Sequence, residues 1–447
     1  MNGKNGLTAL LLTGLLLPAF AGGPGFGAQK KTLENGLTVL LEKDPSSATT
    51  ILQILVKGGM RAEPAGRAGL AFLTTRLAVE IPDSGKAQEL IALATRISII
   101  GQGDSSSIHI ECLSSNLEPS LKVLSKIFLD PLFSGLRVDA VKRHMEHQGR
   151  VEEDDSVELG HLAALRAFFA GSGYGGSTNG DKASLDSIKG RDVSDFYKNT
   201  FVGSNILLCF ASDLPEETLL SLAGRSFARL PSGNPVILKP VPASELKEKS
   251  IRLERDTKQA FVSAAYRLPA TSRRNFALAT ILQTALGKGQ GSRLWPLRAE
   301  KKLAYNVNCR LTQWQEGGLI EAYLETDAAQ ADMAREALGA LMSGFLDGGM
   351  TEEELLSAKT AAKADFLRDT EAKSRRVSTL ALFESLGLGF EFFDALLSEI
   401  DAPGLDEVNA YIEEILAPEN ALEVIIGPKP AGPRSEGVIL RSFWPVP

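Results

Sequence analysis

The sequence is poor in cysteine, with only Cys112, Cys209 and Cys309 among its 447 residues. Their spacings are too wide for a zinc ribbon, and a disulfide framework would need more of them. Each cysteine lies within an apolar stretch, "IHIECL", "NILLCF" or "NVNCRL". We therefore expect buried thiols, with one disulfide bond as the alternative in an oxidising compartment.

Long apolar runs are also scarce, and the one that stands out is N-terminal, at residues 7–17. It follows Lys4 and precedes "AFA" at residues 19–21, the small-x-small pattern that signal peptidase reads. The pattern predicts a signal peptide over residues 1–21 and an exported protein, periplasmic or extracellular; a buried N-terminal helix is the alternative. No later run reaches the roughly 18 apolar residues of a membrane helix, so we expect no membrane insertion after cleavage.

A strong charge imbalance is absent as well, since the net charge is −7. This mild acidity argues against nucleic acid as the principal partner. Hydrophobic residues make up 44% of the chain and charged residues 23%, which is typical of a globular protein. The chain is long enough for two or three domains with ordinary cores.

The apolar patterns predict two halves of similar α+β plan. In the first half we expect strands over 37–43, 49–59, 105–113 and 205–212, and helices over 69–81, 86–97, 117–130 and around residues 144 and 162. In the second half we expect strands over 260–268, 303–312, 319–326 and 421–427, and helices over 275–286, 331–344, 351–383 and 405–416. The predicted domains are lobes over 30–235 and 251–430, a linker over 236–250 and a tail over 431–447.

Three stretches carry a family resemblance. The opening "LENGLTVLLEKDPSSATTILQILVKGGMRAEPAGRAGLA" resembles that of the M16 (pitrilysin/insulinase) metallopeptidase family, and residues 173–214 and 286–309 are similar to its later segments. The resemblance covers nearly the whole chain after the leader. It implies two homologous M16-type lobes, LuxS/mitochondrial processing peptidase-like, that form half of a clam-shaped chamber.

The family's zinc motif, H-x-x-E-H, is degenerate in this sequence. In that motif two histidines on one helical face bind zinc and the glutamate acts as general base. After "GLA" at residues 69–71, the motif positions fall on Phe72, Thr75 and Arg76. Phenylalanine has no donor atom for zinc, threonine is no base near neutral pH, and arginine adds a fixed positive charge. We expect this chain to bind no zinc and to be inactive alone.

The remaining candidate ligands do not rebuild this site. The third ligand position of the family falls on Gln148, or on Glu146 with a small shift. His144 and His147 are three residues apart on a predicted helix with Glu146 between them, so a metal there is a minor alternative to a solvated helix face. His109 and His161 are isolated, and we expect structural roles for both. No G-x-S-x-G motif supports a serine triad.

In the second half the resemblance implies a functional pair, Arg298 and Tyr305, within "SRLWPLRAEKKLAY". In the family the matching arginine and tyrosine reach the zinc site and hold substrate and the tetrahedral intermediate. A guanidinium and a phenol can both donate to a developing oxyanion. The alternative is a solvated arginine and a core tyrosine.

The segment "GKGQGSR" contributes Gly287, Gly289 and Gly291 to a further candidate site. Its order is wrong for a phosphate-binding loop, and no strand immediately precedes it. It resembles the glycine-rich substrate loop of the non-catalytic subunit of mitochondrial processing peptidase. A flexible connection between two helices remains the equal alternative.

These features predict a non-catalytic M16 subunit of an exported heterodimeric zinc endopeptidase. The partner would be an M16 chain that carries H-x-x-E-H and the zinc, and the substrate a peptide or unfolded polypeptide. The alternatives are a peptide-binding or scaffold protein with no peptidase role, and an independent hydrolase that uses His144 and His147.

Overall fold

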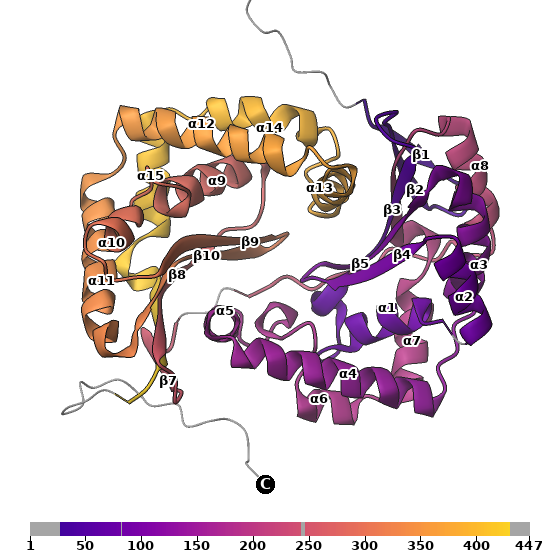
Figure 1. Cartoon of the computed structure of the whole chain (residues 1–447), viewed down its shortest axis with the longest axis horizontal. Coiled ribbons are helices and arrows are strands. Elements are labelled where there is room, and N and C mark those ends of the chain that lie inside the picture. The colour runs from indigo at the N-terminus through magenta and orange to yellow at the C-terminus, as the bar shows by residue number, and fades with distance from the viewer. Residues whose placement is uncertain (1–26, 82, 243–245, 430–447) are drawn as a thin grey trace, which may run out of the picture.

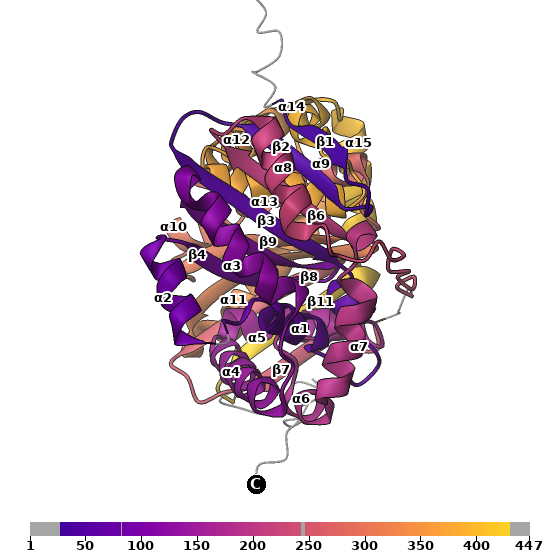
Figure 2. The ribbon, with the colours of Figure 1, turned by 90° about the vertical axis from the view of Figure 1, so that its right-hand side faces the viewer.

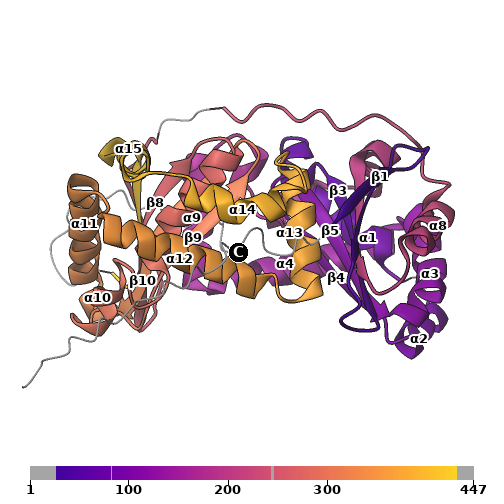
Figure 3. The same ribbon diagram turned by 90° about the horizontal axis from the view of Figure 1, so that it is seen from above.

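The structure, a computed structural model, describes residues 27–81, 83–242 and 246–429. The predicted signal peptide and the predicted tail over 431–447 lie outside the described residues. Within these ranges the chain forms two lobes, each built on one β-sheet, as Figure 1 shows. An extended segment between the lobes runs along one side of the molecule (Figure 3).

The first lobe contains a six-stranded sheet in the order β1-β2-β6-β3-β5-β4. Its strands are β1 (Gln29–Thr32), β2 (Thr38–Lys43), β3 (Thr49–Lys57), β4 (Arg96–Gly101), β5 (Ser105–Leu113) and β6 (Ile206–Ser212). Its helices are α1 (Leu70–Val79), α2 (Ser84–Ala92), α3 (Leu117–Leu129), α4 (Gly135–Asp154), α5 (Ser156–Phe168), α6 (Lys182–Ser187), α7 (Gly190–Thr200) and α8 (Glu216–Phe227). Helices α3 and α8 pack on one sheet face, and Figure 2 shows them in front of the strands.

The second lobe contains a five-stranded sheet in the order β7-β11-β8-β10-β9. Its strands are β7 (Ser250–Glu254), β8 (Gln259–Leu268), β9 (Asn306–Trp314), β10 (Gly317–Asp327) and β11 (Ala421–Gly427). Its helices are α9 (Arg273–Gly287), α10 (Trp295–Ala299), α11 (Ala331–Gly348), α12 (Glu352–Asp369), α13 (Lys373–Ser385), α14 (Phe392–Asp401) and α15 (Leu405–Ile415). Across the second sheet, the order β7-β11-β8-β10-β9 corresponds strand for strand to β2-β6-β3-β5-β4 of the first sheet. Each sheet has one parallel pair, β7 with β11 and β2 with β6. The prediction of two similar α+β lobes is confirmed.

The lobes exchange helices across their boundary. Apolar residues of α5 pack against Phe261 and Ala265 of the second sheet. In return, Val377 and Leu380 of α13 join the core cluster that includes Ile51 of the first sheet. Figure 1 shows both helices between the two sheets. Because each sheet is covered by a helix from the other half of the chain, neither lobe completes its core alone.

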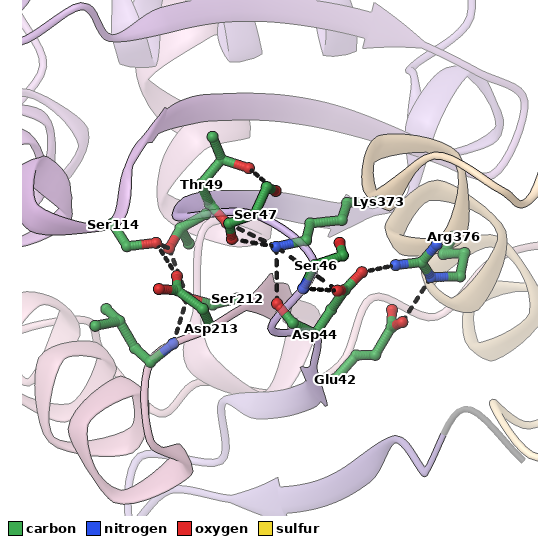
Figure 4. Close-up of polar contacts among 12 residues, drawn as sticks. Glu42, Asp44, Ser46, Ser47, Thr49, Ser114, Ser212, Asp213, Lys373 and Arg376 are labelled. Atoms are coloured by element: carbon green, nitrogen blue, oxygen red, sulfur yellow. Dashed lines mark hydrogen bonds and ion pairs between the residues drawn. The ribbon is translucent and has the colours of Figure 1, made fainter.

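A buried polar junction accompanies α13 where it meets the first sheet (Figure 4). Arg376 Nε donates to Glu42 Oε1 at 2.6 Å, and the same guanidinium pairs with Asp44. Lys373 Nζ donates to the carbonyl oxygens of Asp44, Ser47 and Thr49 at 2.8, 2.9 and 3.2 Å. Glu42 and Arg376 are 3% and 5% exposed, so this ion pair is shielded from water.

Two predicted helices end differently in the structure. The helix expected over 86–97 is α2, which ends at Ala92, and the residues after it form the edge strand β4. Alternating burial along Arg96–Gly101 is the signature of a strand and overrides the helical reading. The helix expected over 351–383 is broken at 370–372 into α12 and α13, because α13 packs on the other sheet. Strand β7 and helix α14 were not predicted from the sequence.

The three cysteines are free and buried, as predicted. Burial raises the pKa of the Cys112 thiol to about 11 and also raises the pKa values of Cys209 and Cys309. Among the described residues, no helix is long and apolar enough to cross a membrane.

Candidate functional site

Helix α1 carries the degenerate motif, and its start is tightly fixed. Gly69, at the N-cap, has a left-handed φ of 91°, and a Cβ there would lie 3.0 Å from backbone atoms of Gly180. The backbone N–H of Ala71 donates to Glu63 Oε1 at 2.9 Å, which satisfies one of the free amides of the first turn. The frame of the helix is therefore intact.

The side chains at the motif positions do not fit a zinc ion. Thr75 is 1% exposed and donates its hydroxyl to the carbonyl of Ala71 at 2.9 Å. The Arg76 guanidinium lies 5.5 Å from the centroid of the Phe72 ring, in a cation–π contact, and burial lowers the pKa of Arg76. Phe72 also packs against Gly101 of β4. An aromatic ring and a cation thus fill the ligand positions of the motif.

The candidate ligands on α4 lie beside α1 without forming a ligand set. His144 and His147 are exposed, and Glu146 pairs with Arg150 at 3.6 Å. Slight desolvation by its neighbours, together with the charges of Arg76 and His147, lowers the pKa of His144. Within the described residues, no group of three or more His, Cys, Asp or Glu side chains is placed to hold a metal. Gln148, the other candidate for the third ligand, is half-buried on the same helix.

His161 has partners that sequence reasoning missed. Its Nδ1 lies 3.0 Å from Glu321 Oε2, and its Nε2 lies 3.3 Å from the Thr312 hydroxyl. His161 belongs to α5, so these contacts link the first half of the chain to β9 and β10 of the second. The partners are some 160 residues away in sequence, so no local sequence pattern predicts these contacts. His109, on β5, is partly buried, which lowers its pKa.

Arg298 and Tyr305 line one open pocket of about 370 Å³. Arg298 lies on α10, and its guanidinium carbon is 5.2 Å from the Trp295 ring centroid. Tyr305 directly precedes β9, is 53% exposed, and hydrogen-bonds to Asp327, which raises the pKa of the phenol. The exposed Tyr305 is therefore not the core residue of the alternative reading. Helices α10 and α1 lie in opposite lobes, well separated in Figure 1.

The candidate glycine loop connects α9 to α10. Gly287 is the last residue of α9, and a Cβ there would lie 2.2 Å from the backbone nitrogen of Cys309, so close packing requires glycine. Gly289 and Gly291 are exposed, and nothing lies within 4 Å of a Cβ at either position. The first glycine thus packs the lobe, whereas the other two leave the loop open to solvent.

The chain has the two lobes of a metallopeptidase, but the positions of its zinc motif carry side chains that do not bind metal. These two features together indicate a non-catalytic relative of a metallopeptidase. Residues 38–180 match the family described as "Insulinase (Peptidase family M16)", and residues 187–362 match the "Peptidase M16 inactive domain". The chain belongs to the M16 family and is of its non-catalytic type.

Relatives and solved structures agree with this assignment. The chain is 24% identical over 382 residues to the "Non-peptidase homolog YmxG" of Helicobacter pylori, which covers 84% of this chain and 88% of the relative. Its fold is similar to a peptidase M16 inactive domain from Pseudomonas fluorescens, with a TM-score of 0.82, 20% identity and coverage of 91% of this chain and 100% of that one. A chain of Complex III2 from Candida albicans matches with a TM-score of 0.77, 18% identity and coverage of 90% and 96%.

Proposed function

We propose that this chain is the non-catalytic subunit of an exported M16 zinc endopeptidase. A partner M16 chain brings H-x-x-E-H and the metal, and the present chain brings Arg298, Tyr305 and half of the chamber wall. The observation that carries the proposal is an asymmetry between the lobes. The first lobe has a ring and a guanidinium at the ligand positions, whereas the second keeps the exposed Arg298 and Tyr305 in one pocket.

The residue types of the pair suit stabilisation of a transition state. Arg298 has several N–H donors and a permanent positive charge. Tyr305 has one O–H donor, which Asp327 accepts in this chain and which would have to turn from Asp327 to the oxyanion in the completed site. Donors fixed in place before reaction are most effective where negative charge develops, as on the oxyanion of peptide hydrolysis. Since α10 is well separated from α1 in this chain, the pair would serve the site of a second chain (Figure 1).

Export is part of the proposal and rests on residues 1–21 alone. Their charged start, apolar run and "AFA" sequence are those of a signal peptide. Expression of the full chain fused to a periplasm-dependent reporter tests this part, and a reporter that stays inactive while the fusion accumulates contradicts export.

Reconstitution tests the subunit role. The experiment measures cleavage of an unstructured peptide by this chain, by an M16 protein with an intact motif encoded beside it, and by the mixture, all with zinc. We expect activity on mixing that falls at least tenfold with Arg298→Gln or Tyr305→Phe, because one lost oxyanion donor costs roughly 10²–10³ in rate. Arg191→Gln removes an arginine whose side chain is 91% exposed and should change nothing. Hydrolysis by this chain alone would refute the proposal.

A scaffold or peptide-binding role is the second candidate. The similarity to a chain of Complex III2 favours it, since that protein belongs to a larger assembly. A stable complex with the M16 partner but no gain in hydrolysis would support this candidate.

A further inference from the structure

The pocket of Arg298 and Tyr305 contains polar groups that the oxyanion role leaves unused. Lys302, Thr326 and Gln330 also line it. Two cations, Arg298 and Lys302, face one carboxylate, Asp327, which leaves an excess of one positive charge. The Asp327 carboxylate is already hydrogen-bonded to Tyr305. The pocket therefore offers mainly donors, and its chemistry favours an oxygen-rich anion.

Thr326 lies at the buried side of this pocket with an unsatisfied hydroxyl. Side chains alternate along β10, so Thr326 shares a sheet face with Leu324, which belongs to the same core cluster as Leu297 of α10. Thr326 is 0% exposed, and its Oγ1 has no hydrogen-bond partner within the described part of the chain. With no exposed surface, this hydroxyl belongs to the inner wall of the pocket, and the cationic groups that a ligand can reach are those of the exposed Arg298 and Lys302.

Lys302 is held in an unusual backbone conformation at the mouth of the pocket. Its φ is 53°, and within the described residues only Ala94 is another non-glycine residue with positive φ. The loop is fixed on both sides, since Lys301 N donates to Pro296 O at 3.0 Å and Leu303 N donates to Leu297 O at 2.9 Å. Strained backbone of this kind tends to persist where it positions a functional group.

We propose that this pocket is a subsite for a carboxylate of the peptide substrate, bound by Arg298 and Lys302. The inference rests on the proposed function, because it takes peptide as the occupant of the pocket. It adds a substrate class: peptides with an acidic side chain, or a free C-terminal carboxylate, near the bond that is cleaved. Both sources present the same group, and the choice of probes separates them.

Binding to this chain alone is the first test and needs no partner. Calorimetry compares three capped probes: acetyl-Ala-Glu-Ala-amide, acetyl-Ala-Gln-Ala-amide and acetyl-Ala-Gln-Ala with a free carboxylate. We expect one charged probe to bind about tenfold more tightly than the neutral amide, and which one does so identifies the source. Equal affinity for all three overturns the inference, as does inorganic phosphate that binds as tightly as the better peptide.

Variants locate the interaction. Lys302→Asn removes the charge but keeps a residue that tolerates left-handed backbone, and it should reduce the preference about tenfold. Lys301→Asn is the matched control, since Lys301 is exposed and does not line the pocket. The midpoint of urea unfolding of Lys302→Asn should equal that of the unsubstituted chain, and an unchanged preference in the folded variant would overturn the inference.

The reconstitution assay separates the two proposals. Hydrolysis on mixing with no preference for acidic or free-carboxylate peptides overturns the subsite and leaves the subunit role standing. Carboxylate-selective binding without hydrolysis on mixing contradicts the subunit role instead.

Discussion

The junction between α13 and the first sheet gives the sharpest prediction about stability. Arg376→Met removes the guanidinium from between Glu42 and Asp44 (Figure 4). Glu42 is 3% exposed, and its Oε2 already has no hydrogen-bond partner among the described residues. Loss of Arg376 would leave a buried carboxylate without its counter-charge. Breaking a buried pair from one side typically costs about 3–5 kcal/mol, and we expect the variant in that range.

Urea unfolding followed by circular dichroism measures this loss, and two comparisons interpret it. The double variant Glu42→Leu/Arg376→Met should recover much of the stability, because apolar replacement of both partners of a buried pair is often neutral. Arg225→Met breaks the pair of Arg225 with Glu118, whose side chains are 62% and 68% exposed. Exposed pairs contribute at most about 1 kcal/mol, so this control should barely move the midpoint.

The same experiment reports on coupling between the lobes. Because α13 completes the core of the first sheet, loosening it should split one cooperative unfolding transition into two, with the first lobe unfolding earlier. An Arg376→Met variant that loses less than about 1 kcal/mol, no more than the exposed control, would refute the argument that the junction is shielded and holds the lobes together.

Three further predictions concern the helix α1 region and the thiols. Gly69→Ala should destabilise the fold by about 1–3 kcal/mol in thermal unfolding, because φ is 91° and the added Cβ meets the backbone of Gly180; an unchanged midpoint would contradict this. Desolvation raises the pKa of Glu63 to about 8, so the folded state holds a proton that the unfolded state releases near pH 4.5. Stability should therefore fall as pH rises between these values, by at most about 1.4 kcal/mol per pH unit, and Glu63→Gln should remove that dependence. The three buried thiols should resist a disulfide reagent in the native protein and react fully in urea; fast native labelling would show that they are accessible.

Local patterns predicted most elements of the fold. Period-two alternation marked strands such as β5, and β11 begins and ends where its apolar run does. The errors arose where tertiary contacts decide. The break between α12 and α13 has no proline or glycine at 370–372, and it exists because α13 turns to cover the other sheet. The edge strand β4 follows α2 after only three residues, 93–95, and no proline or glycine among them marks the end of the helix.

The candidate site, too, was predicted only in part from the sequence. The family motif placed Phe72, Thr75 and Arg76 on one helix. The resemblance to the family implied the pairing of Arg298 with Tyr305, which the structure brings into one pocket. Sequence could not supply the rest of that pocket. Thr326 and Asp327 come from the end of β10, which pairs with β9 so that they lie next to Tyr305. Their contribution follows from strand register and not from any local pattern.

Packing explains why the frame of an active site persists here without its chemistry. Leu70, Leu73 and Leu77 of α1 form one apolar stripe that packs against Met145 of α4 and Val193 of α7. Phe72 and Arg76, at two of the ligand positions, are not part of that fully buried stripe. The helix is therefore required by the core of the first lobe whether or not it binds metal. Substitutions at the ligand positions could remove the zinc while leaving the fold intact, provided that another chain supplies the metal.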